Sequence, residues 1–222
     1  MSYAVLVVLA LLIAVVDWFA VARKHTQLEL FTKPAVMLVL LVWLALNGGL
    51  RLPLLWFWLG LAFSLAGDIL LLPRLDRFVP ALLAFILAHL CYIAGYNQAP
   101  PPLNLPALVI ALLVLLASAQ VYRRTAAGLR ANGNTALQPL ILAYTAIISL
   151  MLFSALATLL RPEWRLIAAA LAAAGAFLFY ISDAILAWNR FIFPLRYGRI
   201  ANRITYQLGQ LLIALAAVLH YS

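Results

Sequence analysis

Long runs of apolar residues, separated by short polar segments, follow one another along the whole chain. Eight such runs can be marked, and each is close to the ~20 residues that a helix needs to cross a bilayer. The alternating pattern of a membrane β-barrel is absent. We therefore predict an all-α fold, a polytopic transmembrane bundle of eight spanning helices that forms a single domain over residues 1–222. The predicted spans are 3–22, 34–50, 54–72, 78–96, 103–122, 137–160, 163–188 and 200–221.

Prolines and turn residues indicate where the runs begin and end. Pro34, Pro139 and Pro162 stand at or near predicted helix starts, where a proline removes no helical hydrogen bond. The first run has no basic flank before it and no small-residue cleavage site after it. We expect it to be a retained helix and not a signal peptide that is removed.

The composition supports this class and excludes two others. Hydrophobic residues make up 68% of the 222 residues and charged residues only 9%. A soluble domain has about a quarter of its residues charged, and a disordered chain is poor in apolar residues. Eight spans leave almost no chain for a domain outside the membrane, so any chemistry must take place among the helices.

The net charge of +9 could indicate a protein that binds nucleic acid, but the distribution of the basic residues argues against it. They lie in short loops, as topology signals do, and no basic stripe or binding motif predicts a nucleic-acid partner. Twelve lie in the odd-numbered loops and three on the other side, so the odd loops are predicted to be cytoplasmic and both termini extracytoplasmic. The twelve are Arg23, Lys24, Lys33, Arg74, Arg77, Arg123, Arg124, Arg130, Arg190, Arg196, Arg199 and Arg203.

Three acidic residues fall inside predicted spans, namely Asp17, Asp68 and Asp183. An ionisable residue within a spanning helix costs at least ~2.5 kcal/mol at mid-helix, so it usually has a partner or a function. Each acid precedes a basic residue of the next loop by six or seven positions, which places it roughly 9–10 Å inside the boundary. Three separate helices thus place an acid at one level.

Other polar residues join that level, whereas the opposite half of the bundle is nearly all Leu, Ala, Val and Ile. This asymmetry predicts a polar cavity that opens toward the cytoplasm or the inner leaflet. We expect Asp17 to be structural, paired with Lys33 or a loop arginine, and Asp68 and Asp183, which lie in similar segments, to be functional. The remaining polar residues of the level are Lys33, His89, Tyr92, Gln138, Tyr144, Tyr180, Tyr206 and Gln210.

The sequence predicts no metal site and no disulfide. Cys91 is the single cysteine and lies within an apolar run, which is typical of a small buried hydrophobic residue. One buried histidine and scattered acids do not form a typical zinc site.

An ordered set of short motifs resembles the YhhN-like lysoplasmalogenase family, eight-helix membrane proteins of bacteria and animals. Gln207 departs from the pattern, because a second tyrosine is expected there. The matching segments are Lys33-Pro34, Phe63–Asp68, Phe85, Ala88–Tyr92, Gly175–Asp183, Arg190-Phe191, Thr205-Tyr206 and Gln210–Ile213.

The resemblance implies hydrolysis of the sn-1 vinyl ether of lysoplasmalogens to a fatty aldehyde and a glycerophospho-ethanolamine or -choline. Protonation of the alkene carbon needs a carboxylic acid, and the oxocarbenium ion that follows needs a carboxylate, as in glycosidases. Asp68 and Asp183 are the predicted acid–base pair, and no cofactor is required. The predicted substrate-binding or orienting residues are Lys33, His89, Tyr92, Tyr180, Arg190, Tyr206 and Gln210, with Arg74 as another cation for the phosphate.

Two other readings compete with hydrolysis. Buried Asp and His residues also mark proton paths, so a proton-coupled transporter or lipid flippase is the alternative. In the third reading the acids only hold helices together. The predicted partners are a lysophospholipid and membrane lipids, and a homodimer is left open. The Ala- and Leu-rich composition with short loops favours a bacterial inner membrane, with the site in the cytoplasmic leaflet.

Overall fold

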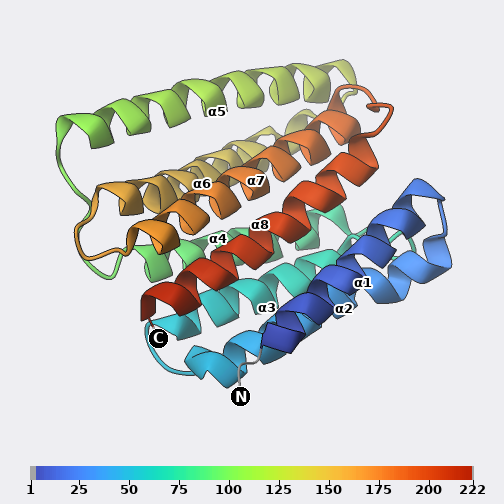
Figure 1. The fold of residues 1–222 in the computed structure, drawn as a ribbon. Coiled ribbons are helices and arrows are strands. Elements are labelled where there is room, and N and C mark those ends of the chain that lie inside the picture. The colour runs from blue at the N-terminus through green and yellow to red at the C-terminus, as the bar shows by residue number, and fades with distance from the viewer. Residues whose placement is uncertain (1–3, 222) are drawn as a thin grey trace.

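Eight long helices joined by short connections make up residues 4–221, the part of the chain that the computed structural model describes (Figure 1). No strand occurs among these residues, so the predicted all-α bundle is confirmed. Three single helical turns lie at Ala45–Gly49, Thr135–Leu137 and Thr158–Leu160. The helices are α1 (Ala4–Ala22), α2 (Thr26–Leu44), α3 (Leu54–Leu70), α4 (Phe78–Tyr96), α5 (Leu105–Ala131), α6 (Gln138–Ala157), α7 (Leu166–Phe191) and α8 (Gly198–Tyr221).

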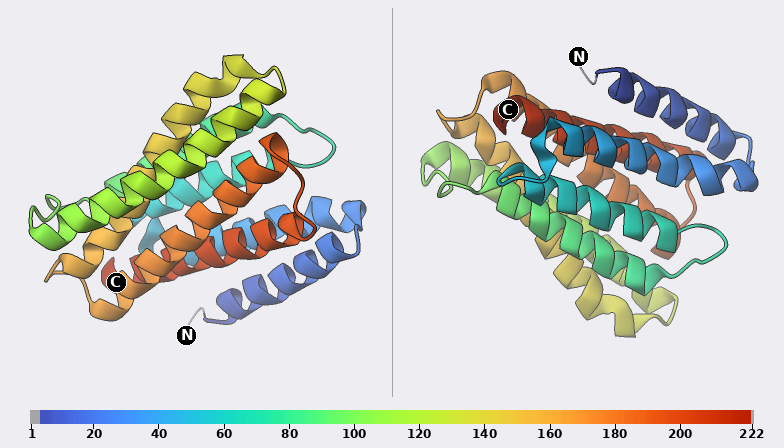
Figure 2. Two further views of the ribbon diagram at one scale, coloured as in Figure 1. Left: turned by 90° about the horizontal axis from the view of Figure 1, so that it is seen from above. Right: turned by 90° about the horizontal axis from the view of Figure 1, so that it is seen from below.

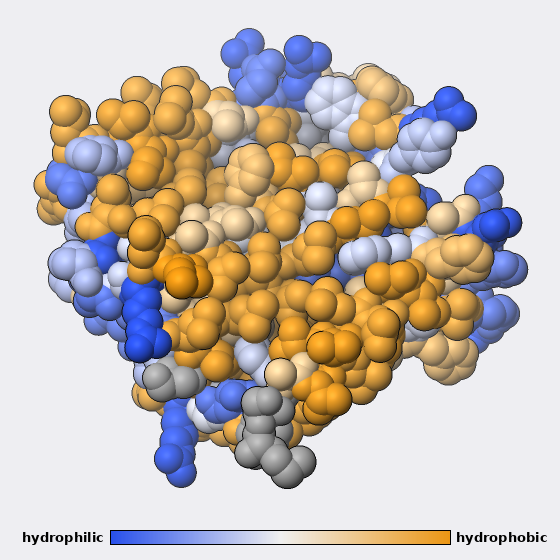
Figure 3. Space-filling model, in the orientation of Figure 1, coloured by the Kyte–Doolittle hydropathy of each residue, from blue (hydrophilic) through white to orange (hydrophobic). Residues whose placement is uncertain are grey.

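The helices have the length and composition of membrane spans. Seven of them are long and apolar enough to cross a bilayer, and α3, at 17 residues, is the shorter apolar helix. At 1.5 Å per residue α3 is about 26 Å long, which lies at the lower end of the spanning range. Apolar side chains cover most of the face in Figure 3, and hydrophilic ones gather mainly along its rims. The chain is an integral membrane protein.

The predicted start of α2 was wrong. Helix α2 begins at Thr26, eight residues before the predicted start at 34, so Pro34 lies inside the helix and Lys33 is not at its start. Hydropathy missed this first part because it carries polar side chains. Glu29 and Lys33 are nevertheless buried, since they face other helices instead of lipid.

The polar ends of α5 and α7 also continue as helix beyond the apolar runs. Helix α5 ends at Ala131 and not at residue 122, so Arg123, Arg124 and Arg130 are helical and not in a loop. Helix α7 continues to Phe191, which places Arg190 in its last turn. The hydrophobic run ends where the bilayer interface is expected, and nothing there breaks the helix.

Helices α7 and α8 form the most closely packed pair. A Cβ atom on Gly175 would lie 2.8 Å from the main-chain nitrogen of Ile213 and 2.9 Å from the carbonyl oxygen of Gly209. Small residues therefore allow the two backbones to touch, as is common between membrane helices. Helix α1 lies on the outside beside α2, and α5 lies over α6 and α7 (Figure 2).

Four connections meet at one end of the bundle, on the right of Figure 1: α1–α2, α3–α4, α5–α6 and α7–α8. We call this the basic end, because the twelve basic residues of the odd connections lie at or near it. Arg51, Arg161 and Arg165 lie toward the opposite end. That the basic end faces the cytoplasm remains a prediction.

Candidate functional site

Asp68 lies near the end of α3 and is paired with a lysine. Lys33 of α2 places its Nζ 3.0 Å from Asp68 Oδ1, and Tyr206 of α8 donates its hydroxyl to Asp68 Oδ2 at 2.8 Å. Only 2% of the Asp68 side chain is exposed. A lysine and a hydroxyl donor both favour the ionised form of this carboxyl, whereas its burial opposes ionisation.

Asp183 has different partners. Tyr144 of α6 donates a hydrogen bond to Asp183 Oδ2, and His89 Nε2 of α4 lies 3.6 Å from the same oxygen. His89 Nε2 and the Tyr144 hydroxyl are 3.2 Å apart, so the three groups are mutually close. No lysine or arginine pairs with Asp183 among the described residues. This carboxyl therefore lacks the cation that Asp68 has.

The two carboxyls line one small pocket at the basic end, with about 290 Å³ of empty space. The other polar residues that line it are Lys33, Ser182, Asn202, Arg203 and Tyr206. Asp68 of α3 and Asp183 of α7 thus line one pocket, and their action as an acid–base pair stays a prediction.

A larger apolar cavity, with about 640 Å³ of empty space, begins where this pocket ends. Leu71, Phe85, Asp183 and Leu186 line both spaces. The cavity continues between α4, α5, α6 and α7, and Tyr144 and Tyr180 are among its few polar groups. Asp183 therefore stands at the junction of a polar pocket and an apolar cavity.

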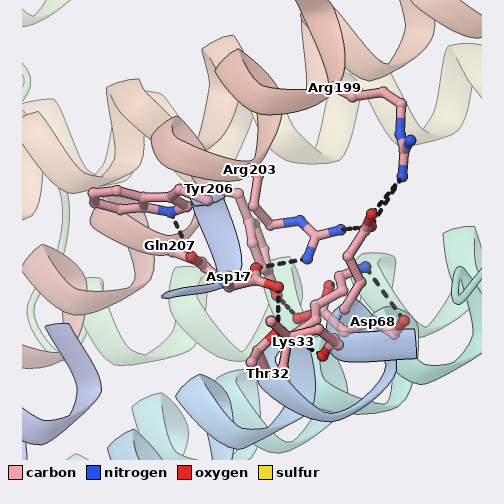
Figure 4. A network of polar contacts seen from close by, with 11 residues as sticks. Asp17, Thr32, Lys33, Asp68, Arg199, Arg203, Tyr206 and Gln207 are labelled. Carbon is pink, nitrogen blue, oxygen red and sulfur yellow. Dashed lines mark hydrogen bonds and ion pairs between the residues drawn. The ribbon is translucent and has the colours of Figure 1, made fainter. Parts of the chain in front are cut away.

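Asp17 belongs to a separate charged network around Arg203, shown in Figure 4. Arg203 Nη1 is 2.7 Å from Asp17 Oδ2, and Arg203 Nη2 is 3.5 Å from Glu29 Oε2. Arg199 pairs with the same Glu29 oxygen at 2.9 Å. Both acids are fully buried, and their charges are matched by two arginines. Such an arrangement holds α1, α2 and α8 together.

The expected pairing of Asp17 with a basic residue is confirmed, but the partner is Arg203 and not Lys33, which binds Asp68. Arg203 itself lies in α8 and not in a loop. Because it binds Asp17 and lines the pocket of Asp68 and Asp183, the three acids lie in one layer, as the sequence predicted.

Gln207 has a structural role in this layer. It donates its amide to Asp17 Oδ2 at 2.8 Å and accepts a hydrogen bond from Trp18 Nε1 at 2.7 Å. The departure from the expected tyrosine therefore concerns the α1–α8 contact, and Gln207 does not line the carboxylate pocket.

The other predicted binding residues are divided among different places. Tyr92 donates to Gln210 Oε1 at 2.6 Å within the core, and neither residue lines the pocket or the apolar cavity. Tyr180 lines the cavity and shares a hydrogen bond with Ser118 at 3.0 Å. Arg190 pairs with Asp76 at 3.0 Å outside both spaces.

Three residues of the site lie outside the catalytic and binding residues that the sequence predicts. Tyr144 belongs to the predicted polar level, but its contact with Asp183 depends on how α6 packs against α7. Asn202 donates its amide to the carbonyl of Ser182 at 2.7 Å and so fixes α8 beside the carboxyl of α7. Arg203 was assigned to a loop. In the sequence, the polar side chains in the first turns of α8 were the one feature that indicated these roles.

The end of the bundle opposite to the site is closed by packed aromatic and hydrogen-bonded groups. Arg161 donates to the carbonyl of Tyr96 at 2.9 Å and to Asn97 Oδ1 at 2.8 Å, and partial burial lowers the pKa of its guanidinium. The rings of Trp164 and His220 stack with centroids 3.9 Å apart. The buried acids among residues 4–221 are Asp17, Glu29 and Asp68, which all lie toward the basic end, so no buried carboxyl of the described residues matches them at this end.

Residues 4–221 contain no group of three or more His, Cys, Asp or Glu side chains that could hold a metal ion. Cys91 is a free, buried thiol, as expected. Nothing about the donor set of the site points to a particular cofactor.

The fold and the site together define a polytopic integral membrane protein with a carboxylate-bearing cavity among its helices. The family model of the YhhN family matches residues 28–217. The chain belongs to the YhhN family, and the resemblance seen in the sequence is confirmed.

Curated relatives carry a functional name. Human lysoplasmalogenase TMEM86A is 36% identical over 163 residues, 72% of this chain and 63% of the relative. Rat lysoplasmalogenase TMEM86B is 31% identical over 189 residues, 84% of this chain and 70% of the relative. The chain thus spans less than two thirds of the length of the TMEM86A relative. No solved structure matches the fold.

Proposed function

We propose that this protein hydrolyses the sn-1 vinyl ether of a lysoplasmalogen, giving a fatty aldehyde and a glycerophospho-ethanolamine or -choline. One observation carries the proposal: two carboxyls with different partners line one pocket, and one of them borders an apolar cavity. A vinyl ether on a long chain needs this combination of groups. The relatives named lysoplasmalogenase support the same reaction.

The two carboxyls divide the chemistry between them. Asp183, which has no lysine or arginine partner, donates a proton to the alkene carbon distant from the ether oxygen. The oxygen then bears the positive charge of an oxocarbenium ion. Asp68, held as an anion by Lys33, stabilises this cation and accepts a proton from the attacking water. When the hemiacetal collapses, the glycerol oxygen takes the proton from Asp68 and leaves, and the hydroxyl proton of the hemiacetal passes to Asp183 as the aldehyde forms.

Tyr144 and His89 act on Asp183. The Tyr144 hydroxyl donates to Asp183 Oδ2, so the transferred proton is carried by Oδ1, which lies 3.4 Å from the Ser182 hydroxyl. His89, fully buried and beside both groups, holds the tyrosine in place. Tyr206 has the corresponding role at Asp68, because its hydroxyl fixes the orientation of that carboxylate.

The location of the reaction follows from the position of the pocket. The basic end is proposed to face the cytoplasm, as the excess of Lys and Arg predicts, so the substrate approaches from the inner leaflet of a bacterial inner membrane. Exposed cations near this end, such as Arg74, meet the phosphate of the headgroup. No step of the proposal requires a homodimer, which remains a sequence-level prediction.

The decisive experiment measures aldehyde release from alkenyl-lysophosphatidylethanolamine by the purified protein in detergent. Asp68→Asn and Asp183→Asn are each expected to lower turnover by at least about a hundredfold, because each removes a general acid or base. Asp76→Asn, which changes an exposed carboxylate outside the site, is the matched control and keeps full activity. Normal turnover by folded Asp68→Asn or Asp183→Asn protein contradicts the mechanism.

Transport by a buried Asp/His path has less support. The buried acids lie in one layer, whereas a proton path to the other side needs further acidic groups toward the opposite end, where the buried charged residue of the described chain is Arg161. Absence of aldehyde together with pH-dependent lipid or proton flux in sealed vesicles would favour the transporter.

A further inference from the structure

A groove follows the lipid-facing side of the bundle between α5 and α6. It extends from Tyr122 to Ala111 along α5 and from Leu142 to Phe153 along α6, with about 1050 Å³ of empty space. Eleven residues of helix correspond to about 16 Å. Helix α5 leaves this room because it packs loosely: 17% of its apolar window is buried, against 44% for α6 and 50% for α7.

The surface of the groove is mostly apolar, although four hydroxyl residues line it, three along its length and Tyr122 at one end. Ser149 donates to the carbonyl of Thr145 at 2.5 Å, and Thr145 donates to the carbonyl of Ile141 at 2.8 Å. The hydroxyls of Ser118 and Tyr180 share a hydrogen bond at 3.0 Å. The hydroxyls of Ser118, Thr145 and Ser149 are thus satisfied within the protein, so the groove offers mainly methyl and methylene groups to whatever lies in it.

The groove and the apolar cavity beside Asp183 share a wall. Thr145 lines both spaces. Tyr180 lines the cavity, its hydrogen-bond partner Ser118 lines the groove, and this side-chain pair separates the two. The groove and the cavity that contains Asp183 are therefore adjacent spaces, with Thr145 and the Ser118–Tyr180 pair between them.

The direction of the groove indicates its occupant. Tyr122 and Leu142 lie toward the basic end, and Ala111 and Phe153 lie toward the opposite end, so the groove runs along the helices as lipid tails do. A single-chain lipid with its headgroup at the basic end would place its reacting bond near Asp183. Its remaining chain would then point along the groove.

We infer that the groove between α5 and α6 binds the distal hydrocarbon chain of the substrate, a lipid with one unbranched chain, and that Ala146 sets the space for it. The inference rests on the proposed function and names the subsite that holds the chain. Ala119 and Ala146 are small and exposed in the groove, so a large side chain at either position would fill it. Because the surrounding lipid is equally apolar, the groove acts by positioning the chain and not by hydrophobic affinity.

The test is photo-crosslinking with a lysophosphatidylethanolamine whose uncleavable alkyl ether chain carries a diazirine at its middle. Wild-type protein in lipid nanodiscs is labelled with and without excess hexadecyl lysophosphatidylethanolamine, and the labelled segments are mapped by mass spectrometry. A phosphatidylcholine with the same diazirine reports surrounding lipid. The variants are Ala146→Phe and, as matched control, Ala143→Phe, an exposed alanine of α6 that lines neither space.

The expected result is competable label on 111–122 and 142–153, reduced about tenfold (~1.4 kcal/mol) in Ala146→Phe and unchanged in Ala143→Phe. Competable label that persists in Ala146→Phe, or that maps to other helices, overturns the inference. Aldehyde release is measured in parallel on the cleavable lipid. If wild-type protein shows the groove label but releases no aldehyde, the proposed reaction fails while the chain site stands.

Discussion

Replacement of Asp17 by asparagine separates a structural acid from the two proposed catalytic ones. The substitution keeps the shape of the side chain and removes its charge. In the structure Asp17 accepts hydrogen bonds from Arg203, Gln207 and Thr32 at 2.6–2.8 Å and is fully buried. An amide nitrogen cannot accept these bonds, so at least one donor loses its partner.

The expected loss of stability depends on the ion pair that Arg203 retains in the variant. Removal of one member of a buried ion pair costs about 3–5 kcal/mol, because the other charge stays buried without compensation. Arg203 is 11% exposed and retains Glu29 at 3.5 Å, which favours the lower end of the range. A loss of about 3 kcal/mol corresponds to a decrease in Tm of roughly 6–12 °C for a chain of this length.

The assay is thermal unfolding in detergent, followed by tryptophan fluorescence, together with aldehyde release at a temperature where every variant is folded. Asp76→Asn is the matched control, since Asp76 is 62% exposed and its pair with Arg190 contributes at most about 1 kcal/mol. We expect Asp17→Asn to melt well below both proteins and to retain turnover per folded molecule. If it melts like Asp76→Asn, or if it is folded but inactive, the structural assignment of Asp17 is wrong.

Two further predictions concern the site and the helix packing. Tyr144→Phe removes the hydroxyl that would stabilise the Asp183 carboxylate as its proton is transferred. A hydrogen bond to a charged group contributes about 1.5–3 kcal/mol, so aldehyde release should decrease about ten- to hundredfold with the Tm little changed. Tyr197→Phe, at an exposed tyrosine that lines none of these spaces, should not reproduce the decrease, and equal activity of the two variants would remove Tyr144 from the mechanism. Gly175→Leu should lower the free energy of unfolding by at least about 2 kcal/mol in denaturant titration, because the new side chain would meet the backbone of α8. Ala174→Leu, on the exposed face of α7, should be nearly neutral. Equal stabilities of the two variants would refute the close approach of α7 and α8.

Much of the fold could be predicted from the sequence because burial in lipid is a local property of each helix. Eight apolar runs predicted eight helices, and the boundaries of α4 were obtained at both ends, Phe78 and Tyr96. The prediction was wrong where a helix carries polar residues that face other helices, as in α2 from Thr26 to Lys33, and where α5 continues beyond the apolar run. Hydropathy measures contact with lipid and says nothing about an interior polar face.

The candidate site likewise has one part that could be predicted from the sequence and one part that could not. The sequence by itself determined that three acids lie at one level, because depth follows from the helical rise and the position of the next loop. Only the tertiary structure decided that Asp17 binds Arg203, that Lys33 binds Asp68, and that Tyr144 reaches Asp183. These pairings depend on how each helix is rotated and which neighbours it has, and in this chain they are set by contacts between residues as many as 186 positions apart.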